Sequence, residues 1–305
     1  MVQRPRCAVL PSDRGSALAD AVRDGGGEVV AASDADAVIW TDPKDPRALR
    51  ELLDRHPEIR WVQLPFAGIE PFVDLLDEDR IWTCGKGVYA EPVAEHALML
   101  GLAGLRGGAL YARETSWSDP YGHNLLHGRV TILGGGEITR VLVRLLRPFG
   151  AYLKVVRNRP EPIDGVAEVF PSSRLVEAVN DADLVVLALA LTPETEGIID
   201  ADVLAAMPSH AWLVNVARGR HVDTDALVDA LRAGDIGGAG LDVTEPEPLP
   251  EGHPLWHLPN VLITPHVGNT PEMGITLLAA RVRDNVQRFA AGEELLGPVY
   301  TDLGY

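Results

Sequence analysis

Cysteine and positive charge are both scarce in this sequence, and each shortage excludes classes of protein. Cys7 and Cys84 are its two cysteines, too few and too far apart for a disulfide framework or a zinc site, so we expect no metal. Lys and Arg number 27 against 44 Asp and Glu, which leaves a net charge of −17 and argues against a nucleic-acid partner. An anionic ligand would therefore have to be bound by nearby arginines rather than attracted from a distance.

Long apolar runs are missing as well. The longest, Ala97 to Leu105, spans nine residues, whereas a membrane-crossing helix needs about 20. No signal-peptide pattern is present either, so the sequence predicts a cytoplasmic protein with no membrane partner. What remains is an ordinary globular composition, 46% hydrophobic and 23% charged, in a chain of 305 residues that is long enough for two domains.

The N-terminal third alternates strands and helices. Short apolar runs predict five strands, at Arg6–Leu10, Glu28–Ala31, Ala37–Thr41, Arg60–Leu64 and Ile81–Cys84, with helical patterns at Ser16–Asp24 and Pro46–Arg55. This alternation predicts a parallel sheet covered by helices on both faces. The turn Pro65-Phe-Ala-Gly-Ile69 follows the fourth strand, where Ala67 and Gly68 are placed to offer backbone N–H groups to a small anion. By itself, such a turn is more often a plain connection.

A long helix is predicted over Glu91–Arg106, and its second half is apolar almost all round. We therefore expect a helix buried between two bodies and a domain boundary near residue 100. The segment Ser116 to Gly128 is rich in aromatic and polar residues without a clear period, which predicts a loop.

The stretch from Gly128 to Thr139 has the pattern of a dinucleotide-binding turn. The apolar run Val130–Leu133 predicts a buried strand, and a helical apolar face follows the glycines, at Ile138, Val141, Leu142, Leu145 and Leu146. Gly134 would allow the tight turn and Gly136 the approach of a pyrophosphate, with N–H groups from the first helical residues, Glu137 and Ile138. Thr139 stands where the third glycine of the motif is usual, which weakens the pattern.

The next predicted strand, Leu153–Asn158, indicates which dinucleotide the chain binds. An acidic residue that accepts from the ribose hydroxyls normally lies about 20 residues past the glycines. Here Arg157, Asn158 and Arg159 end the strand, and no Asp or Glu lies between Leu153 and Pro160. Guanidinium groups match a phosphate better than a neutral ribose, so we predict a pocket for the 2′-phosphate of NADP. The alternative is a pair of solvated arginines in a loop.

Further strands are predicted at Asp183–Leu189, Trp212–Val216, Gly238–Val243 and Val261–Thr264, which with the two above make a six-stranded doubly wound sheet. Arg218, Glu247 and His266 follow the last three of these strands. Each is ordinary alone, but together they would gather at the cofactor edge of one sheet. Met273–Ala290 predicts a last helix with one apolar face.

These motifs resemble the D-isomer-specific 2-hydroxyacid dehydrogenase family over almost the whole chain. The matching pieces are Ala67-Gly68, the Val88–His96 helix start, the glycine turn, Leu191-Thr-Pro-Glu-Thr195, Asn215-Val-Ala-Arg-Gly219, Glu247-Pro-Leu249 and Thr264-Pro-His266. The resemblance implies an α/β protein with two doubly wound parallel-sheet domains, usually a homodimer. A flavodoxin-like substrate domain, residues 1–99 completed by 271–305, would carry an inserted Rossmann cofactor domain, residues 100–270.

The resemblance also implies roles for individual residues. Arg218 would bind the substrate carboxylate and polarise the 2-oxo group, and His266 would be the general acid in reduction. Glu247 would orient the imidazole and favour its protonated form. Ala67 and Gly68 would contact the substrate with Arg218 and His266. The cofactor would be bound by Gly134, Gly136, Glu137, Ile138, Arg157, Asn158, Arg159, Ala190, Thr195 and Asp242.

Taken together, the sequence predicts an NADP(H)-preferring reductase of small 2-oxo acids, similar to glyoxylate/hydroxypyruvate reductases. NAD remains possible as the cofactor. One alternative is an NAD-linked dehydrogenase of a larger D-2-hydroxy acid, with Phe66 and Trp117 lining a wider pocket. The other is a dinucleotide-sensing binding protein like the corepressors of this family.

Overall fold

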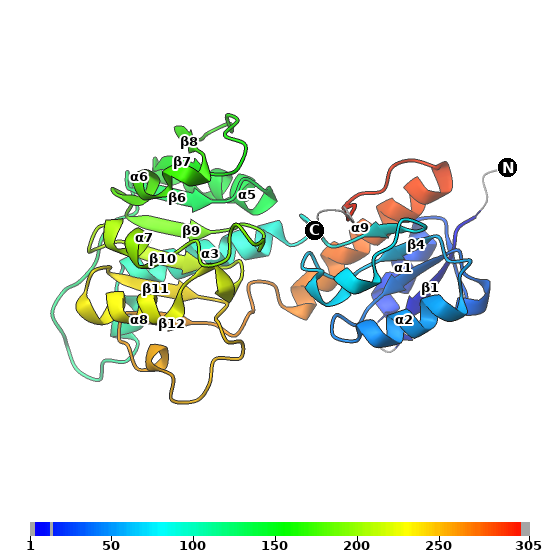
Figure 1. Cartoon of the computed structure of the whole chain (residues 1–305), viewed down its shortest axis with the longest axis horizontal. Helices are drawn as coiled ribbons and strands as arrows, with labels where there is room; N and C mark the ends of the chain where they lie inside the picture. The colour runs from blue at the N-terminus through cyan, green and yellow to red at the C-terminus, as the bar shows by residue number, and fades with distance from the viewer. Residues whose placement is uncertain (1–3, 13–14, 300–305) are drawn as a thin grey trace. The chain divides into compact units, whose positions relative to one another are not determined.

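Alternating apolar strands and amphipathic helices build two parallel sheets, each in its own unit of the chain (Figure 1). The computed structural model describes residues 4–12 and 15–299, so residues 1–3 and 300–305 of the predicted substrate domain lie outside the described part. The first unit runs up to Tyr89 and resumes at Thr270, and the second is Ala90–Asn269. The predicted boundary near residue 100 is therefore about ten residues late. The reason is that helix α3 (Ala90–Leu105) packs along its whole length in the core of the second unit.

The first unit holds a five-stranded sheet in the order β2-β1-β3-β4-β5, with every pairing parallel. Its strands are β1 (Arg6–Leu10), β2 (Glu28–Val29), β3 (Ala37–Trp40), β4 (Trp61–Gln63) and β5 (Ile81–Thr83). Helices α1 (Ser16–Asp24) and α9 (Pro271–Ala291) cover one face, and α2 (Pro46–Arg55) with the 3₁₀ helix η3 (Glu70–Leu75) covers the other. This strand order is the flavodoxin-like one, as predicted.

The second unit holds a parallel sheet in the order β12-β11-β10-β9-β6-β7-β8. Its strands are β6 (Arg129–Leu133), β7 (Tyr152–Val156), β8 (Glu168–Phe170), β9 (Leu184–Leu187), β10 (Trp212–Asn215), β11 (Gly238–Leu241) and β12 (Val261–Ile263). The prediction of six strands was wrong because it missed β8. That strand has three residues and pairs on one side with β7, so it lacks the continuous apolar run of a central strand.

Helices cover both faces of this second sheet (Figure 1). Helix α3 and α5 (Glu137–Leu146) share one core with the sheet, and α6 (Leu175–Val179), α7 (Ala201–Ala206) and α8 (Thr224–Ala233) share the other. The remaining short elements are α4 (Gly108–Tyr111), η2 (Ala32–Asp34), η4 (Arg147–Phe149), η5 (Ser172–Arg174), η6 (Gly219–His221) and η7 (Pro254–Trp256). The predicted fold class, two doubly wound α/β domains, is confirmed.

The order of the strands decides where a ligand can bind. Strand β6 lies between β7 and β9, so the chain leaves β6 toward one side of the sheet and later returns to its other side. Ligands of open α/β sheets bind at the carboxyl ends of the strands beside such a reversal. No helix in the described part of the chain is long and apolar enough to cross a membrane.

Candidate active site

The glycine turn after β6 has the geometry of a phosphate-binding turn. Gly134 has a φ of +108°, and a Cβ there would lie 2.2 Å from the carbonyl oxygen of Ala188, so no other residue fits. A Cβ at Gly136 would meet nothing within 4 Å, which leaves the backbone open to a ligand. Helix α5 starts directly afterwards and its N-cap, Gly136, supplies no side-chain acceptor. Its first N–H groups are thus available for a pyrophosphate, and the turn fits a dinucleotide.

Thr139 does not weaken this turn as the sequence suggested. Its side chain is fully buried, and Oγ1 donates a hydrogen bond to the carbonyl oxygen of Gly134 at 2.8 Å. The hydroxyl therefore ties the first turn of α5 back to the glycine turn. The nearby carboxylate of Glu137 accepts from Arg140 at 2.6 Å, which offsets its repulsion of an anionic ligand.

The residues that follow β7, Arg157 to Arg159, present positive charge. Arg157 packs its side chain over Gly135, where a Cβ would come within 2.9 Å of the arginine Cδ and Nε, and Arg159 is exposed. Within the described part of the chain, neither guanidinium pairs with an acidic side chain. Asn158 accepts a hydrogen bond at Oδ1 from Ser172 Oγ at 2.9 Å. These side chains form a group of donors that matches a phosphate monoester.

Arg218, Glu247 and His266 follow β10, β11 and β12, three neighbouring strands of the sheet. His266 Nδ1 and Glu247 Oε1 are 2.7 Å apart, and both side chains are about half exposed, at 52% and 42%. Because Nδ1 is engaged by the carboxylate, Nε2 is the nitrogen that can face a substrate. His266 has a φ of +54°, a left-handed conformation that is unusual for a side-chain-bearing residue and is common at functional positions.

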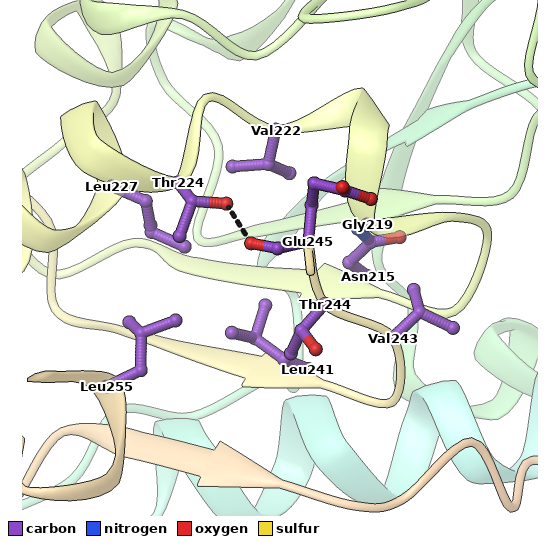
Figure 2. A pocket seen from close by; sticks show the side chains of 10 residues that line it. All are labelled: Asn215, Gly219, Val222, Thr224, Leu227, Leu241, Val243, Thr244, Glu245 and Leu255. Carbon is purple, nitrogen blue, oxygen red and sulfur yellow. Dashed lines mark hydrogen bonds between the residues drawn. The ribbon is translucent and has the colours of Figure 1, made fainter. Parts of the chain in front are cut away.

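The loops that carry Arg218 and Glu247 pack closely against each other. Figure 2 shows Gly219 beside Thr244 and Glu245, and a Cβ on Gly219 would lie 2.0 Å from the Thr244 carbonyl. Thr224 Oγ1 donates to the carbonyl oxygen of Glu245 at 3.0 Å, drawn as the dashed line in Figure 2. The cavity between these residues, about 10 Å³, has room for about one water molecule. The closeness of this packing fixes the spacing between the two loops.

Asp242, predicted to bind the cofactor, is buried beneath the His266 loop. Its Oδ1 accepts from Thr264 Oγ1 at 2.6 Å and from the Val267 N–H at 2.9 Å, and its Oδ2 accepts from the Gly268 N–H at 2.9 Å. His96 Nε2 lies 3.2 Å from Oδ1. Burial raises the pKa of Asp242, but the hydrogen bonds from His96, Thr264 and the two backbone N–H groups outweigh it and lower the pKa to about 2. The carboxylate therefore fastens the His266 loop to the sheet.

Asp242→Asn should lower the free energy of unfolding at pH 7 by about 2–3 kcal/mol, since a carboxyl with a folded pKa near 2 and an unfolded pKa of about 3.9 stabilises the fold by that amount. The contribution is complete above pH 4 and is lost as the pH falls toward 2. Urea unfolding at several pH values measures it. The control is Asp235→Asn, the same charge change at an exposed position. A stability difference that stays constant down to pH 3 would contradict this role.

Ala190 and Thr195 lie in the turn after β9. Thr195 Oγ1 donates to the Ala190 carbonyl oxygen at 2.8 Å, so this hydroxyl holds the turn together. The Thr195 hydroxyl is thus engaged within the turn, and its contact with a cofactor stays a prediction.

Ala67 and Gly68 lie in the first unit, in the turn that follows β4. Within the described residues their backbone N–H groups donate to no acceptor, as a site for a small anion requires. Two hydrogen bonds to carbonyl oxygens hold the turn in place. Tyr89 Oη donates to that of Pro65 at 2.5 Å, and the Gly85 N–H donates to that of Phe66 at 2.9 Å. Phe66 is 40% exposed.

Sequence reasoning missed three residues of the second unit. Ser172 follows β8 and was missed together with that strand, and His96 was noted as part of a motif without its contact to Asp242. His221 was missed because it reads as a plain loop residue next to Arg218, yet it is fully buried. In the described part of the chain, no group of three or more His, Cys, Asp or Glu side chains is arranged to hold a metal.

A sequence profile described as D-isomer specific 2-hydroxyacid dehydrogenase, NAD binding domain, matches residues 96–268, more than half of the chain. The chain therefore belongs to the D-isomer specific 2-hydroxyacid dehydrogenase family, whose members are NAD(P)-dependent enzymes, which confirms the resemblance drawn from its motifs.

Particular relatives are similar along almost the whole chain. An uncharacterized protein in the proB 3′ region of Corynebacterium melassecola is 39% identical over 93% of this chain and 95% of its own length. Glyoxylate/hydroxypyruvate reductase A of Serratia proteamaculans is 29% identical over 88% of this chain and 87% of its own. A crystal structure of a D-isomer specific 2-hydroxyacid dehydrogenase from Xanthobacter autotrophicus, in complex with NADPH and MES, superimposes with a TM-score of 0.83 at 29% identity, covering 99% of this chain and 100% of the other.

Proposed function

We propose that this protein reduces small 2-oxo acids of the glyoxylate/hydroxypyruvate type to D-2-hydroxy acids, with NADPH as the preferred hydride donor. The observation that carries the proposal is the 2.7 Å contact of His266 Nδ1 with Glu247, at the same sheet edge as Arg218. The name of the Serratia relative and the NADPH bound by the Xanthobacter structure support it.

Each of the three residues has a task in this reaction. The Arg218 guanidinium binds the substrate carboxylate through two parallel hydrogen bonds and thereby orients the adjacent 2-oxo group. His266 donates a proton from Nε2 to the carbonyl oxygen as C2 is reduced, and Glu247 stabilises the imidazolium before transfer. The nicotinamide supplies the hydride to C2 when the cofactor is bound. In the first unit, the Ala67 and Gly68 N–H groups stay predicted donors to a small anion.

Turnover of NADPH across a panel of 2-oxo acids tests this function directly. We expect the absorbance of NADPH to fall fastest with glyoxylate and hydroxypyruvate. A preference for 2-oxo acids with long side chains would instead favour the larger-substrate alternative. Tight NADPH binding without turnover of any 2-oxo acid would favour a sensing role. Size-exclusion chromatography with light scattering tests the homodimer, which stays a prediction, as does the cytoplasmic location.

Arg159→Asp should reverse the preference for NADPH over NADH. The 2′-phosphate loses a charge-assisted pairing worth roughly 1.5–3 kcal/mol, or about one to two powers of ten in affinity. The new carboxylate also repels the phosphate and accepts from free ribose hydroxyls. Dissociation constants for both cofactors, measured by fluorescence, give the result. Arg232→Asp, at an exposed position of α8, makes the same charge change as a control. Equal wild-type affinities for the two cofactors would refute a phosphate pocket here.

A further inference from the structure

His221 is a buried titratable residue to which the proposed reaction gives no task. It ends η6, three residues after Arg218, and its side chain is fully buried. The Arg218 N–H donates to His221 Nδ1 at 3.1 Å, and His221 Nε2 lies 3.3 Å from the carbonyl oxygen of Ala190. One imidazole thus connects the backbone of the substrate-binding arginine to the turn after β9, which shapes the cofactor side of the site.

These contacts select one protonation state. Nδ1 must carry a lone pair to accept from the Arg218 N–H, and Nε2 must carry the proton to donate to Ala190. The Arg218 carbonyl oxygen, which accepts from Asn215 Nδ2 at 2.8 Å, also lies 3.0 Å from Nδ1, so a proton on Nδ1 would exchange the contact with the Arg218 N–H for one with this oxygen. A protonated Nδ1 would face the Arg218 N–H, donor against donor. The neutral imidazole with its proton on Nε2 satisfies the contacts with the Arg218 N–H and the Ala190 carbonyl oxygen, whereas the imidazolium keeps the second and loses the first.

The surroundings favour this neutral form. Burial lowers the pKa of His221, and the charge of Arg218 lowers it further. Hydrogen bonds to the carbonyl groups of Ala190 and Arg218 raise the pKa, but the net effect is a lowering. The packed segment after β9 carries Glu194, Glu196 and Asp200. Glu196 pairs with Arg220 at 2.6 Å, Glu194 is hydrogen-bonded by Thr192, and Asp200 accepts from the Val203 N–H at 2.9 Å. Each of these carboxylates has a partner other than His221.

We propose that His221 is a positioning residue that, as a neutral imidazole, holds the Arg218 backbone at a fixed distance from the Ala190 turn. It thereby fixes the position, relative to the cofactor, of the Arg218 guanidinium that binds the substrate carboxylate. This proposal rests on the proposed function, because it assumes that Arg218 binds a carboxylate. A displacement of about 1 Å at such a residue can cost about 10²-fold in rate.

His221→Phe tests the proposal, because the ring is kept while both hydrogen bonds are lost. We expect oxamate, an unreactive carboxylate analogue of 2-oxo acids, to bind the NADPH complex at least tenfold more weakly, and kcat/KM for glyoxylate to fall by about 10–10²-fold. The dissociation constant of NADPH should stay within about threefold, because the variant leaves the glycine turn, Arg157 and Arg159 unchanged. Arg220→Ala, which removes the neighbouring exposed side chain, is the control and should match the wild type.

A second measurement keeps the proposal testable if the variant does not fold. Nitrogen-15 NMR of the histidines in the wild-type chain reports the tautomer of His221, assigned with the variant or by selective labelling. A neutral ring protonated on Nε2 at pH 7 supports the proposal, and a proton on Nδ1 or a charged ring overturns it. Oxamate affinity and kcat/KM within twofold of the wild type in a folded His221→Phe also overturn it. A wild type that reduces no 2-oxo acid refutes the proposed function instead, which separates the two failures.

Discussion

His266→Ala should lower kcat for 2-oxo acid reduction by about 10²–10⁴-fold, the usual contribution of a general acid, and leave NADPH binding intact. The geometry gives the reason. Glu247 holds Nδ1 at 2.7 Å, so the ring presents Nε2 as its proton donor, and alanine removes both the donor and the contact. Single-turnover measurements with NADPH and glyoxylate separate this step from product release.

The control for this variant is His257→Ala, which removes an exposed histidine of the same unit. Glu247→Gln adds a second comparison. It keeps a hydrogen-bond acceptor for Nδ1 but not the negative charge, so we expect partial activity, between those of the wild type and His266→Ala. If His266→Ala turned over within a few-fold of the wild type, the proton would have to come from elsewhere and the assignment would fail.

Arg218→Lys should lower kcat/KM for glyoxylate by about 10–10²-fold, although the charge is kept. A planar guanidinium donates two parallel hydrogen bonds to a carboxylate, whereas an ammonium is a point charge without that geometry. The loss of one charge-assisted bond of roughly 1.5–3 kcal/mol gives this range. We expect both a higher KM and a lower kcat, because the carboxylate also orients the 2-oxo group for proton transfer from His266.

Arg220→Lys is the matched control, since it makes the same change two residues away at an exposed side chain that pairs with Glu196. An uncharged methyl ketone should be a poor substrate for the wild type and should lose little in Arg218→Lys. Equal turnover of a 2-oxo acid and its methyl ketone analogue by the wild type would show that Arg218 does not bind the carboxylate.

Features that depend on neighbours in the sequence were predicted best. The glycine turn, the helix after it and most strands follow from local patterns, and Gly134 adopts the positive φ that the motif requires. The contact of His266 with Glu247 followed from the resemblance and is present in the structure.

Features that depend on distant partners were missed or misjudged. Thr139 is a different case, because its partner, the Gly134 carbonyl oxygen, is only five residues away: the glycine motif alone suggested a weakened turn and did not show that a threonine hydroxyl bonds back to it. The buried network of Asp242 with His96 joins residues 146 positions apart, and no local pattern marks it. Strand β8 is too short to give a periodic signal, so Ser172 beyond it was missed as well.

The division of the chain has a consequence for its synthesis. Helix α9, from the C-terminal end, covers the face of the first sheet that α1 also covers, through Leu278, Val282 and Val286. The second unit, 180 residues from Ala90 to Asn269, is translated between that sheet and that helix. At about 5–20 residues per second, the ribosome needs roughly 10–40 s for it. The second unit can fold as one uninterrupted segment during this time, while the part of the first sheet that α9 covers has to stay exposed until that helix is made.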